Sequence, residues 1–207
     1  MTNIFSIVTF ILILLVSVAF HEYAHGWMAA KLGDPTPKNS GRLTLNPLAH
    51  IDLFGTIIMP ILLIVVSRGT FTFGYAKPVP INPSHFKNPK KDLRLVGAAG
   101  PGANILIALF LSLVLKLDIL VLKEALFWGI MINLILAVFN LIPIPPLDGS
   151  KILASLLPNR LAYNYLRLES YGFLIIMFLI MTGLFRKIIM PFINLILYFL
   201  LKIAGAA

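Results

Sequence analysis

The chain has 207 residues, of which 59% are apolar and only 12% are charged. Soluble domains are nearer half apolar and a quarter charged, so this composition excludes an ordinary soluble protein. The net charge of +9 comes from Lys and Arg residues in short segments between apolar runs. Such loops orient membrane proteins, and they lack the interleaved aromatic residues of a nucleic-acid surface, so no nucleic-acid partner is expected. The chain has no cysteine, which excludes disulfides and thiolate metal ligands.

Apolar runs long enough, or nearly so, to cross a bilayer core of about 30 Å recur along the chain. The first predicted helix covers residues 4–32, and it lacks the basic start and cleavage site of a secretory signal, so we expect it to be retained. Residues 53–66 form a shorter apolar run, and residues 70–76 alternate polar and aromatic side chains as a half-buried strand does. Four further helices are predicted at residues 93–115, 124–142, 166–184 and 188–203.

These elements predict an all-α polytopic membrane protein with about five spanning helices, a re-entrant segment and a small β-hairpin. Residues 42–45 are the candidate partner strand for residues 70–76. No repeat, linker or soluble domain is evident, so the sequence predicts one membrane-embedded domain over residues 1–207. Its core would cover residues 3–150, followed by a C-terminal helical hairpin over residues 166–203.

The first predicted helix contains the sequence His21-Glu22-Tyr23-Ala24-His25, an H-E-x-x-H pattern. Residues four apart lie on one helical face, so both imidazoles can point at one metal ion. Glu22 can then hydrogen-bond a water at the metal and take its proton. In soluble helices such a pattern can be a solvated surface. Here the flanking residues are apolar, and ionisable side chains inside a membrane helix are functional by default.

A catalytic zinc usually takes three protein ligands, so a third must come from elsewhere. Asp148 stands out among the candidates because it follows a proline-rich break, Asn140-Leu-Ile-Pro-Ile-Pro-Pro-Leu-Asp-Gly149. Broken backbone at membrane depth is tolerated only where it is buried in protein or lines a wet cavity. An ordinary loop, with Asp148 capping the next helix, is the alternative reading. The other candidate carboxylates are Asp52, Asp118, Glu124 and Glu169.

The combination of H-E-x-x-H on a membrane helix with N-x-x-P-x-P-x-L-D-G resembles the site-2 protease family of intramembrane metalloproteases. A third family feature, G-P-x-x-N, is matched at Gly100-Pro101-Gly102-Ala103-Asn104. The resemblance covers residues 3–150 and is to the short form, in which no PDZ domain interrupts residues 26–140. It implies that His21, His25 and Asp148 bind one Zn²⁺ per chain and that Glu22 is the catalytic base.

Asn104 and Asn140 are predicted either to bind substrate carbonyls or to support the metal ligands, and ordinary interhelical hydrogen bonds are the alternative. Gly97, Gly100 and Gly102 are expected to allow close backbone approach. His50 and Asp52 form an H-x-D pair that is interpreted as structural hydrogen bonding, with an accessory metal or gating role as the alternative. His85 is expected to be a solvated loop residue.

The metal ligands can meet at one depth only if residues 53–66 do not cross the membrane. Those 14 residues would span only about 21 Å as a helix, too short for a comfortable crossing. Loops 31–50, 68–94 and 143–167 and the C-terminus then share one side and hold 13 of the 17 Lys and Arg residues. The positive-inside rule therefore predicts an external N-terminus and an active site in the cytoplasmic half of the cytoplasmic membrane.

The expected function is hydrolysis of peptide bonds in transmembrane-helix substrates, in regulated intramembrane proteolysis. A helical substrate must unwind before water reaches it, and addition to the strand at residues 70–76 would hold it extended. A metal transporter and an inactive helix-binding relative are the alternatives. The first should show ligands along a path, and the second should lack Glu22 or a ligand. Substrate identity and oligomeric state stay open.

Overall fold

The computed structural model describes residues 4–69 and 72–205 of the chain. A π-helical stretch, Leu53–Ile58, leads directly into the third α-helix, and 3-10 turns lie at Pro47–His50, Pro83–His85 and Leu120–Leu122. The described part of the chain contains no β-strand, so the all-α prediction is confirmed. The α-helices are α1 (Ile4–Lys31), α2 (Thr36–Asn39), α3 (Met59–Val66), α4 (Pro89–Leu115), α5 (Lys123–Asn140), α6 (Asp148–Leu156), α7 (Asn159–Leu166), α8 (Glu169–Met181) and α9 (Leu184–Ala204).

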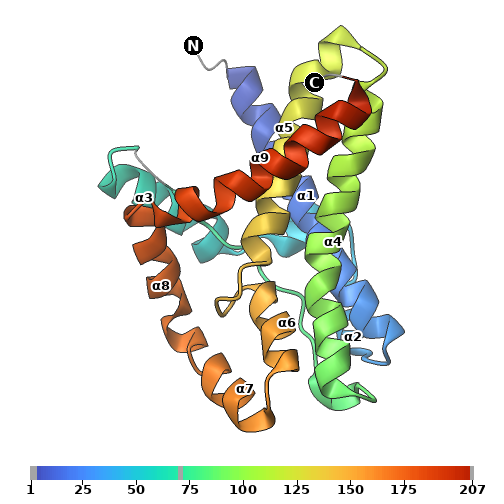
Figure 1. The fold of residues 1–207 in the computed structure, drawn as a ribbon, viewed down its shortest axis with the longest axis vertical. Helices are drawn as coiled ribbons and strands as arrows, with labels where there is room; N and C mark the ends of the chain where they lie inside the picture. The colour runs from blue at the N-terminus through green and yellow to red at the C-terminus, as the bar shows by residue number, and fades with distance from the viewer. Residues whose placement is uncertain (1–3, 70–71, 206–207) are drawn as a thin grey trace.

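Helices α1, α4 and α5 pack against one another and form the body of the molecule (Figure 1). Small and polar side chains fill the contacts of α1, whereas large apolar ones such as Phe5 and Leu12 stay exposed. This distribution suits a lipid environment, where small residues let helices approach closely and apolar residues face the acyl chains. The buried residues of α1 are Ser17, Ala19, His21, His25, Gly26 and Ala29.

Within residues 4–69 and 72–205, four helical segments are long and apolar enough to cross a membrane, namely Ile4–Lys31, Pro89–Leu115, Leu120–Asn140 and Arg186–Ala204. Helices α7 and α8 make a fifth only if they count as one span with a 61° bend. The predicted helix over residues 166–184 is present as α8, which begins and ends three residues inside the predicted bounds, whereas α7 was not predicted. Both helices contact the proline-rich loop, and such tertiary contacts leave no signal in a local apolar pattern.

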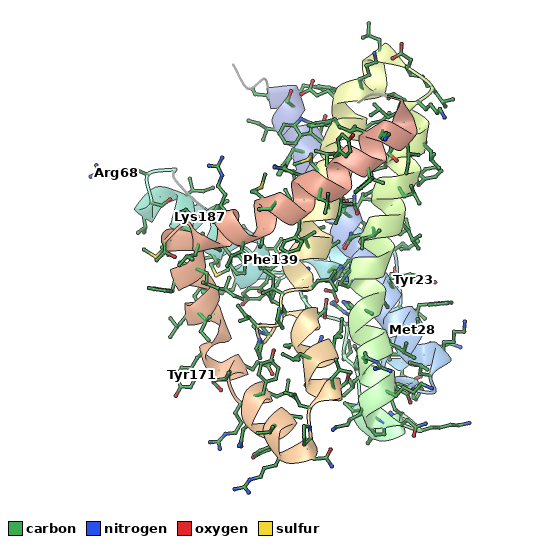
Figure 2. The ribbon with its side chains drawn as sticks, in the orientation of Figure 1. Tyr23, Met28, Arg68, Phe139, Tyr171 and Lys187 are labelled. Atoms are coloured by element: carbon green, nitrogen blue, oxygen red, sulfur yellow. The ribbon has the colours of Figure 1, made fainter. Side chains whose placement is uncertain are left out.

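Helix α9 runs obliquely across α4 and α5 and closes the bundle on that side (Figure 1). In Figure 2, Arg68 and Tyr171 point away from the body of the molecule, whereas Phe139 lies inside it. Apolar side chains buried between α4, α5 and α9 hold the C-terminal helix against the centre of the bundle. The buried members of this cluster are Ala108, Ile130, Leu134, Ile189, Ile193 and Leu200.

The segment that contains α3 leaves and returns to the same place in the fold. After α3 the chain comes back in an extended conformation, and the Lys77 N–H donates to the His50 carbonyl at 2.9 Å. Nearer α3, the Tyr75 N–H donates to the Gly55 carbonyl at 3.1 Å. The Tyr75 ring lies so close to Gly55 that a Cβ there would sit 2.3 Å from Cε2 of the ring. The two ends of the segment therefore lie side by side, as a re-entrant path requires.

The predicted β-hairpin between residues 42–45 and 70–76 is not supported. Residues 70 and 71 lie outside the described residues, and residues 72–76 are extended without a ladder to residues 42–45. The link between these segments is a side chain, since the Arg42 guanidinium donates to the carbonyls of Ala49 and Lys77. An arginine that reaches backbone carbonyls leaves no trace in the alternation pattern on which the hairpin prediction depends.

A fully buried carboxylate ties the end of α1 to the segment that precedes α4. Asp34 is 0% exposed, and its Oδ2 accepts from the Asn82 N–H at 2.7 Å. Its Oδ1 accepts from the Thr36 N–H at 2.9 Å and lies 3.0 Å from His85 Nδ1. Burial alone would raise the pKa of Asp34, but the hydrogen bonds from Thr36, Asn82 and His85 outweigh it and hold that pKa below its ordinary value.

We expect Asp34→Asn to lower the stability of the protein by about 1–3 kcal/mol at pH 7, because an amide cannot accept all of these hydrogen bonds as a carboxylate does. A depressed pKa contributes stability above the unfolded-state value of 3.8, and that contribution is lost as pH falls through the folded-state value. Thermal unfolding in detergent should therefore show a gap from wild type that is constant from pH 7 to about pH 5 and narrows as pH falls below about 4. Asp118→Asn, at a side chain that is 78% exposed, is the control and should leave the melting temperature unchanged.

Candidate metal centre and active site

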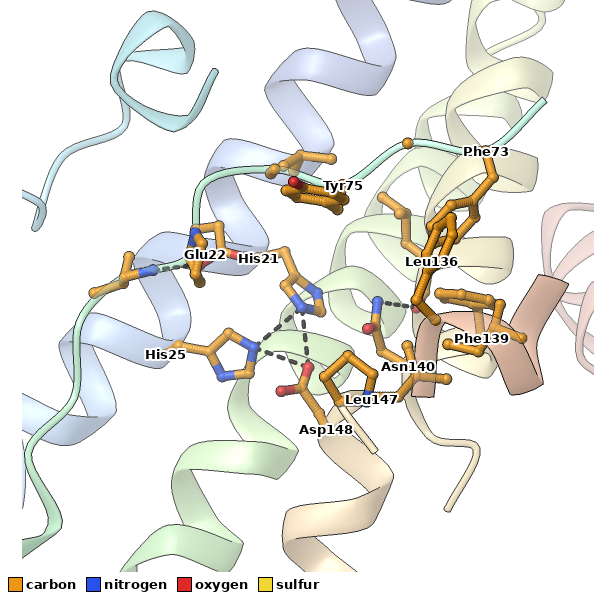
Figure 3. Close-up of a pocket in the computed structure, with 18 of the residues that line it drawn as sticks. His21, Glu22, His25, Phe73, Tyr75, Leu136, Phe139, Asn140, Leu147 and Asp148 are labelled. Atoms are coloured by element: carbon orange, nitrogen blue, oxygen red, sulfur yellow. Dashed lines mark hydrogen bonds and ion pairs between the residues drawn. The ribbon is translucent and has the colours of Figure 1, made fainter. Parts of the chain in front are cut away.

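Two imidazoles from α1 and one carboxylate from α6 converge at the centre of the molecule (Figure 3). Asp148 Oδ2 lies 3.2 Å from His21 Nε2 and 3.0 Å from His25 Nε2, and the two nitrogens are 3.0 Å apart. All three residues are buried, with 4–6% of their surface exposed. The structure thus brings together side chains separated by more than 120 positions in the sequence.

The donor set and its spacing suit a tetrahedral metal ion. The metal-binding atoms of His21, His25 and Asp148 all lie within 4.8 Å of one another. Two imidazoles and one carboxylate are a common ligand set for catalytic zinc, which leaves the fourth position open. Bonds of about 2.0–2.1 Å would place the ligand atoms roughly 3.3 Å apart, so these three side chains need to separate only slightly. Among the described residues, no other group of three such side chains is found.

Helix α4 passes directly against the two imidazoles, and a glycine makes this possible. A Cβ on Gly100 would lie 2.4 Å from His25 Nε2 and 2.6 Å from His21 Nε2. One turn earlier, a Cβ on Gly97 would lie 3.1 Å from the Asp148 carbonyl oxygen. The prediction of close approach is confirmed for these two residues. It was wrong for Gly102, where a Cβ would point into open space with no neighbouring atom within 4 Å.

The outer nitrogen of each imidazole is engaged, which turns Nε2 of both rings toward the metal position. His25 Nδ1 donates to the Val96 carbonyl at 2.7 Å. His21 Nδ1 lies 2.6 Å from Asn104 Oδ1, and Asn104 is fully buried. Such partners fix the orientation of metal-binding histidines and the nitrogen that carries the proton. Asn104 therefore contacts a candidate metal ligand and is not among the residues that line the cavity.

Glu22 projects beside the metal position and is held by a backbone N–H. Its Oε2 accepts from the Val79 N–H at 2.9 Å. Val79 stands between Pro78 and Pro80, neither of which has an N–H, so it offers the only backbone donor of this tripeptide. Val79 packs tightly on α1, since a Cβ on Gly26 would lie 3.1 Å from Val79 Cγ1. One carboxylate oxygen is thus anchored while the side chain still faces the cavity.

A cavity of about 640 Å³ opens onto the three converging side chains and Glu22. One wall is the extended segment with Phe73 and Tyr75, which runs over the site in Figure 3. The opposite wall comes from α5 and α8, whose Phe139 and Phe173 rings lie about 6 Å from the Phe73 ring. An aromatic, apolar cavity with a few converging polar groups is the usual form of a site for a largely apolar substrate.

The proline-rich loop that leads to Asp148 is held by contacts with two later helices. The Tyr165 hydroxyl donates to the Pro143 carbonyl at 2.7 Å, and a Cβ on Gly172 would lie only 1.9 Å from the Pro145 carbonyl oxygen. Helices α7 and α8 therefore lie directly against the loop. Asp148 begins α6, and its Oδ1 accepts from Lys151 Nζ at 2.9 Å. Asp148 can thus stand at the start of a helix, as the alternative interpretation expected, and still belong to the candidate metal site.

The remaining candidates from the sequence have different positions. Asn140 lines the cavity, and its Nδ2 donates to the Leu136 carbonyl at 2.9 Å, so its contact with substrate stays a prediction. His50 is buried and bonded to the Thr44 carbonyl, and Asp52 caps the next helical stretch through the Gly55 N–H. This arrangement supports the structural interpretation of the H-x-D pair. His85 is exposed to solvent, as expected, and it also pairs with the buried Asp34.

Sequence reasoning missed three residues near the site. Val79 could not be recognised from its side chain, because it is its backbone N–H that bonds to Glu22. Asn133 and Ser17 are fully or almost fully buried beside Asn104, and Asn133 Oδ1 accepts from Asn104 Nδ2 at 2.7 Å. A polar side chain in the middle of an apolar helix was the available signal for both.

We expect Gly100→Ala to abolish zinc binding, because its methyl group would occupy the space in which the two imidazoles meet. Gly102→Ala is a matched control two residues away on α4, where the same methyl group meets open space. Zinc content of the purified proteins, measured by elemental analysis, should be about one per chain in the control and close to zero in Gly100→Ala. Equal zinc contents would contradict the close approach of α4 to the site.

Comparison with known proteins identifies relatives over most of the chain. The model of peptidase family M50 matches residues 9–123 and 116–183. "Putative zinc metalloprotease YwhC" of Bacillus subtilis is 40% identical over 195 residues, covering 89% of this chain and 85% of the relative. No solved structure matches the chain.

More distant relatives are longer proteins. "Putative zinc metalloprotease Rip2" of Mycolicibacterium smegmatis is 30% identical over 81% of this chain and 64% of its own length. "Zinc metalloprotease MJ0392" of Methanocaldococcus jannaschii is 28% identical over 95% of this chain and 49% of its own length. The family model spans both the H-E-x-x-H helix and the proline-rich loop with Asp148. This chain belongs to peptidase family M50, the family of the site-2 proteases.

Proposed function

We propose that His21, His25 and Asp148 hold the catalytic zinc of an intramembrane metalloprotease and that Glu22 is its general base. The observation that carries this assignment is the convergence of Nε2, Nε2 and Oδ2 beside a carboxylate at the end of one cavity. Two histidines and an aspartate in apolar surroundings are costly unless they bind something. Lys151, the cation that pairs with Asp148, reaches only the outer oxygen, Oδ1, and leaves the meeting point itself to a metal.

The residues of the site divide the work of peptide hydrolysis between them. A bound zinc ion supplies Lewis acidity that activates water and polarises the scissile carbonyl. Glu22 takes the proton from the attacking water and delivers it to the leaving amine. Because the Val79 N–H holds Oε2, the Glu22 side chain is already turned toward the cavity before substrate arrives. The buried partners of His21 and His25 keep both rings in place during the reaction.

The site lies in the cytoplasmic half of the cytoplasmic membrane, with the N-terminus outside. His21 is about 25 Å along α1 from its start, a distance that supports a position past the middle of a bilayer core of about 30 Å. The end of α6 and the start of α4 lie together, since Lys90 Nζ donates to the Leu157 carbonyl. Residues 31–50, 87–94 and 151–167 contain 10 of the 17 Lys and Arg residues, and loops rich in these residues stay in the cytoplasm. The segment with α3 is then re-entrant.

The substrate is a transmembrane helix that binds in an extended form along residues 72–79. The N–H groups of Tyr75, Lys77 and Val79 all donate to this chain. Because N–H groups alternate sides along an extended backbone, those of Gly74 and Ala76 face the other way. Both residues line the cavity, so their backbone groups can pair with an unwound substrate. Apolar residues of the substrate would then pack against Phe73 and Phe139.

Glu22→Gln should retain zinc and lose activity, because the amide keeps the shape of the side chain but cannot accept a proton. Loss of a general base lowers the rate by about 10²–10⁴-fold. Cleavage of a model membrane helix by the purified protein in detergent measures the rate, and elemental analysis measures the zinc. Cleavage at the wild-type rate would rule out Glu22 as the base, whereas His21→Ala that keeps its zinc would rule out the proposed ligands.

Ala76→Pro should impair cleavage without loss of zinc, because it removes one N–H that is free to pair with substrate. Ala76→Ser keeps the N–H and is the matched control. We expect the proline variant to lose most of its activity and the serine variant to stay near wild type, measured as the KM and kcat for a model helix. Equal rates for the two variants would show that the substrate does not pair with this segment.

A further inference from the structure

A continuous chain of buried hydrogen bonds runs from His21 to the backbone of α5. His21 Nδ1 meets Asn104 Oδ1 at 2.6 Å, and Asn104 Nδ2 donates to Asn133 Oδ1 at 2.7 Å. Asn133 Nδ2 then donates to Ser17 Oγ at 2.9 Å and to the Gly129 carbonyl at 2.8 Å. Asn104 and Asn133 are 0% exposed, and Ser17 is 3% exposed. The chain joins α1, α4 and α5 behind the metal position.

The far end of this chain sets the direction of its hydrogen bonds, and a longer bond of 3.4 Å from Asn104 Nδ2 to the Ser17 carbonyl favours the same direction. The Gly129 carbonyl can only accept, so Asn133 must present its amide NH₂ there and its carbonyl oxygen to Asn104. Asn104 must then present its own NH₂ to Asn133 and its oxygen to His21. An oxygen can only accept, so His21 Nδ1 has to carry the proton. The neutral ring is left with its lone pair on Nε2, the nitrogen that faces His25 and Asp148.

We propose that Asn133, assisted by Ser17, is a positioning residue that fixes the zinc-binding form of His21 through Asn104. This inference rests on the proposed function, since it assumes that His21 is a zinc ligand. The Asn133 side chain hydrogen-bonds to Asn104, Ser17 and the Gly129 carbonyl, and to none of the three converging side chains. It acts by preventing rotation of the Asn104 amide, which would otherwise offer an NH₂ group to His21 and favour a proton on Nε2, where the metal should bind.

Simple adhesion between membrane helices is the competing explanation of these buried amides. Hydrogen bonds between membrane helices contribute only modestly to stability, and adhesion has no preferred direction. A directed chain that ends on a metal ligand predicts something more specific. Groups that orient a zinc-binding histidine typically change metal affinity by about 10–100-fold when they are removed.

The test is the zinc affinity of the purified full-length protein in detergent, measured by competition with a chelator. We expect Asn133→Ala to bind zinc about 10–100-fold more weakly. Asn133→Asp should stay near wild type, because a protonated carboxyl also offers a donor to the Gly129 carbonyl and an acceptor to Asn104. Leu134→Ala is the control on the same helix, fully buried in the apolar cluster, and it should lower stability without a change in zinc affinity.

A second substitution in the weakened variant separates direction from packing. Adding Asn104→Asp to Asn133→Ala gives His21 a carboxylate that can only accept, so zinc affinity should recover toward wild type. A purely structural role of Asn133 predicts no recovery. Ser17→Ala is a milder variant that should weaken zinc binding by a smaller factor, with Ser112→Ala as its buried control on α4. It carries the test if Asn133→Ala does not fold.

Each outcome bears on one of the two proposals. Unchanged zinc affinity in both Asn133→Ala and Ser17→Ala overturns the positioning role, as does equal loss in Asn133→Ala and Asn133→Asp without rescue. His21→Ala distinguishes this failure from that of the proposed function. If His21→Ala loses zinc while Asn133→Ala keeps it, His21 is a ligand and only the inference about Asn133 fails.

Discussion

The fold depends on one contact, in which a carboxylate from α6 meets two imidazoles from α1 inside an apolar bundle. Each of these groups is costly at membrane depth, and the cost is offset only when they face one another and a metal ion. Several neighbouring residues allow these three side chains to come together. Gly100 lets α4 pass against the rings, and the loop that precedes Asp148 is held by Tyr165 and by close packing at Gly172.

Much of this arrangement could be predicted from the sequence, because its strongest signals are local. The spacing of His21 and His25 needs only a helix, and the apolar runs that became α1, α4, α5 and α9 need only a length and a composition. The proline-rich break before Asp148 identified a loop that has to lie in protein or water. What joined the two motifs was the resemblance to the site-2 protease family, and the count of membrane crossings was consistent with it only if residues 53–66 turn back. The adjacent ends of that segment agree with this count.

The errors and omissions are all long-range. The hairpin was inferred from alternation at residues 70–76, but alternation does not name a partner, and the extended segment bonds to residues 50 and 55 instead. The bend between α7 and α8 has no glycine or proline to announce it, and it follows from contacts with a distant loop. In the sequence, Asn133 and Ser17 are isolated polar residues within apolar helices. Only the folded structure shows that Asn133 bonds to both Asn104 and Ser17.

Packed helices form the side of the cavity that carries His21, His25 and Asp148, and an extended segment forms another side. This difference suits the proposed chemistry. Ligands must be held to within a fraction of an ångström, and here they stand on packed helices that are cross-linked by buried amides. The opposite wall is extended backbone, fastened at intervals by N–H groups of Tyr75, Lys77 and Val79. Backbone of this kind is complementary to an unwound peptide, which a wall of helices cannot be, since its N–H groups are used internally. The helices that carry the candidate metal ligands and the extended wall proposed to bind substrate therefore meet at Glu22, which belongs to α1 and bonds to the extended wall.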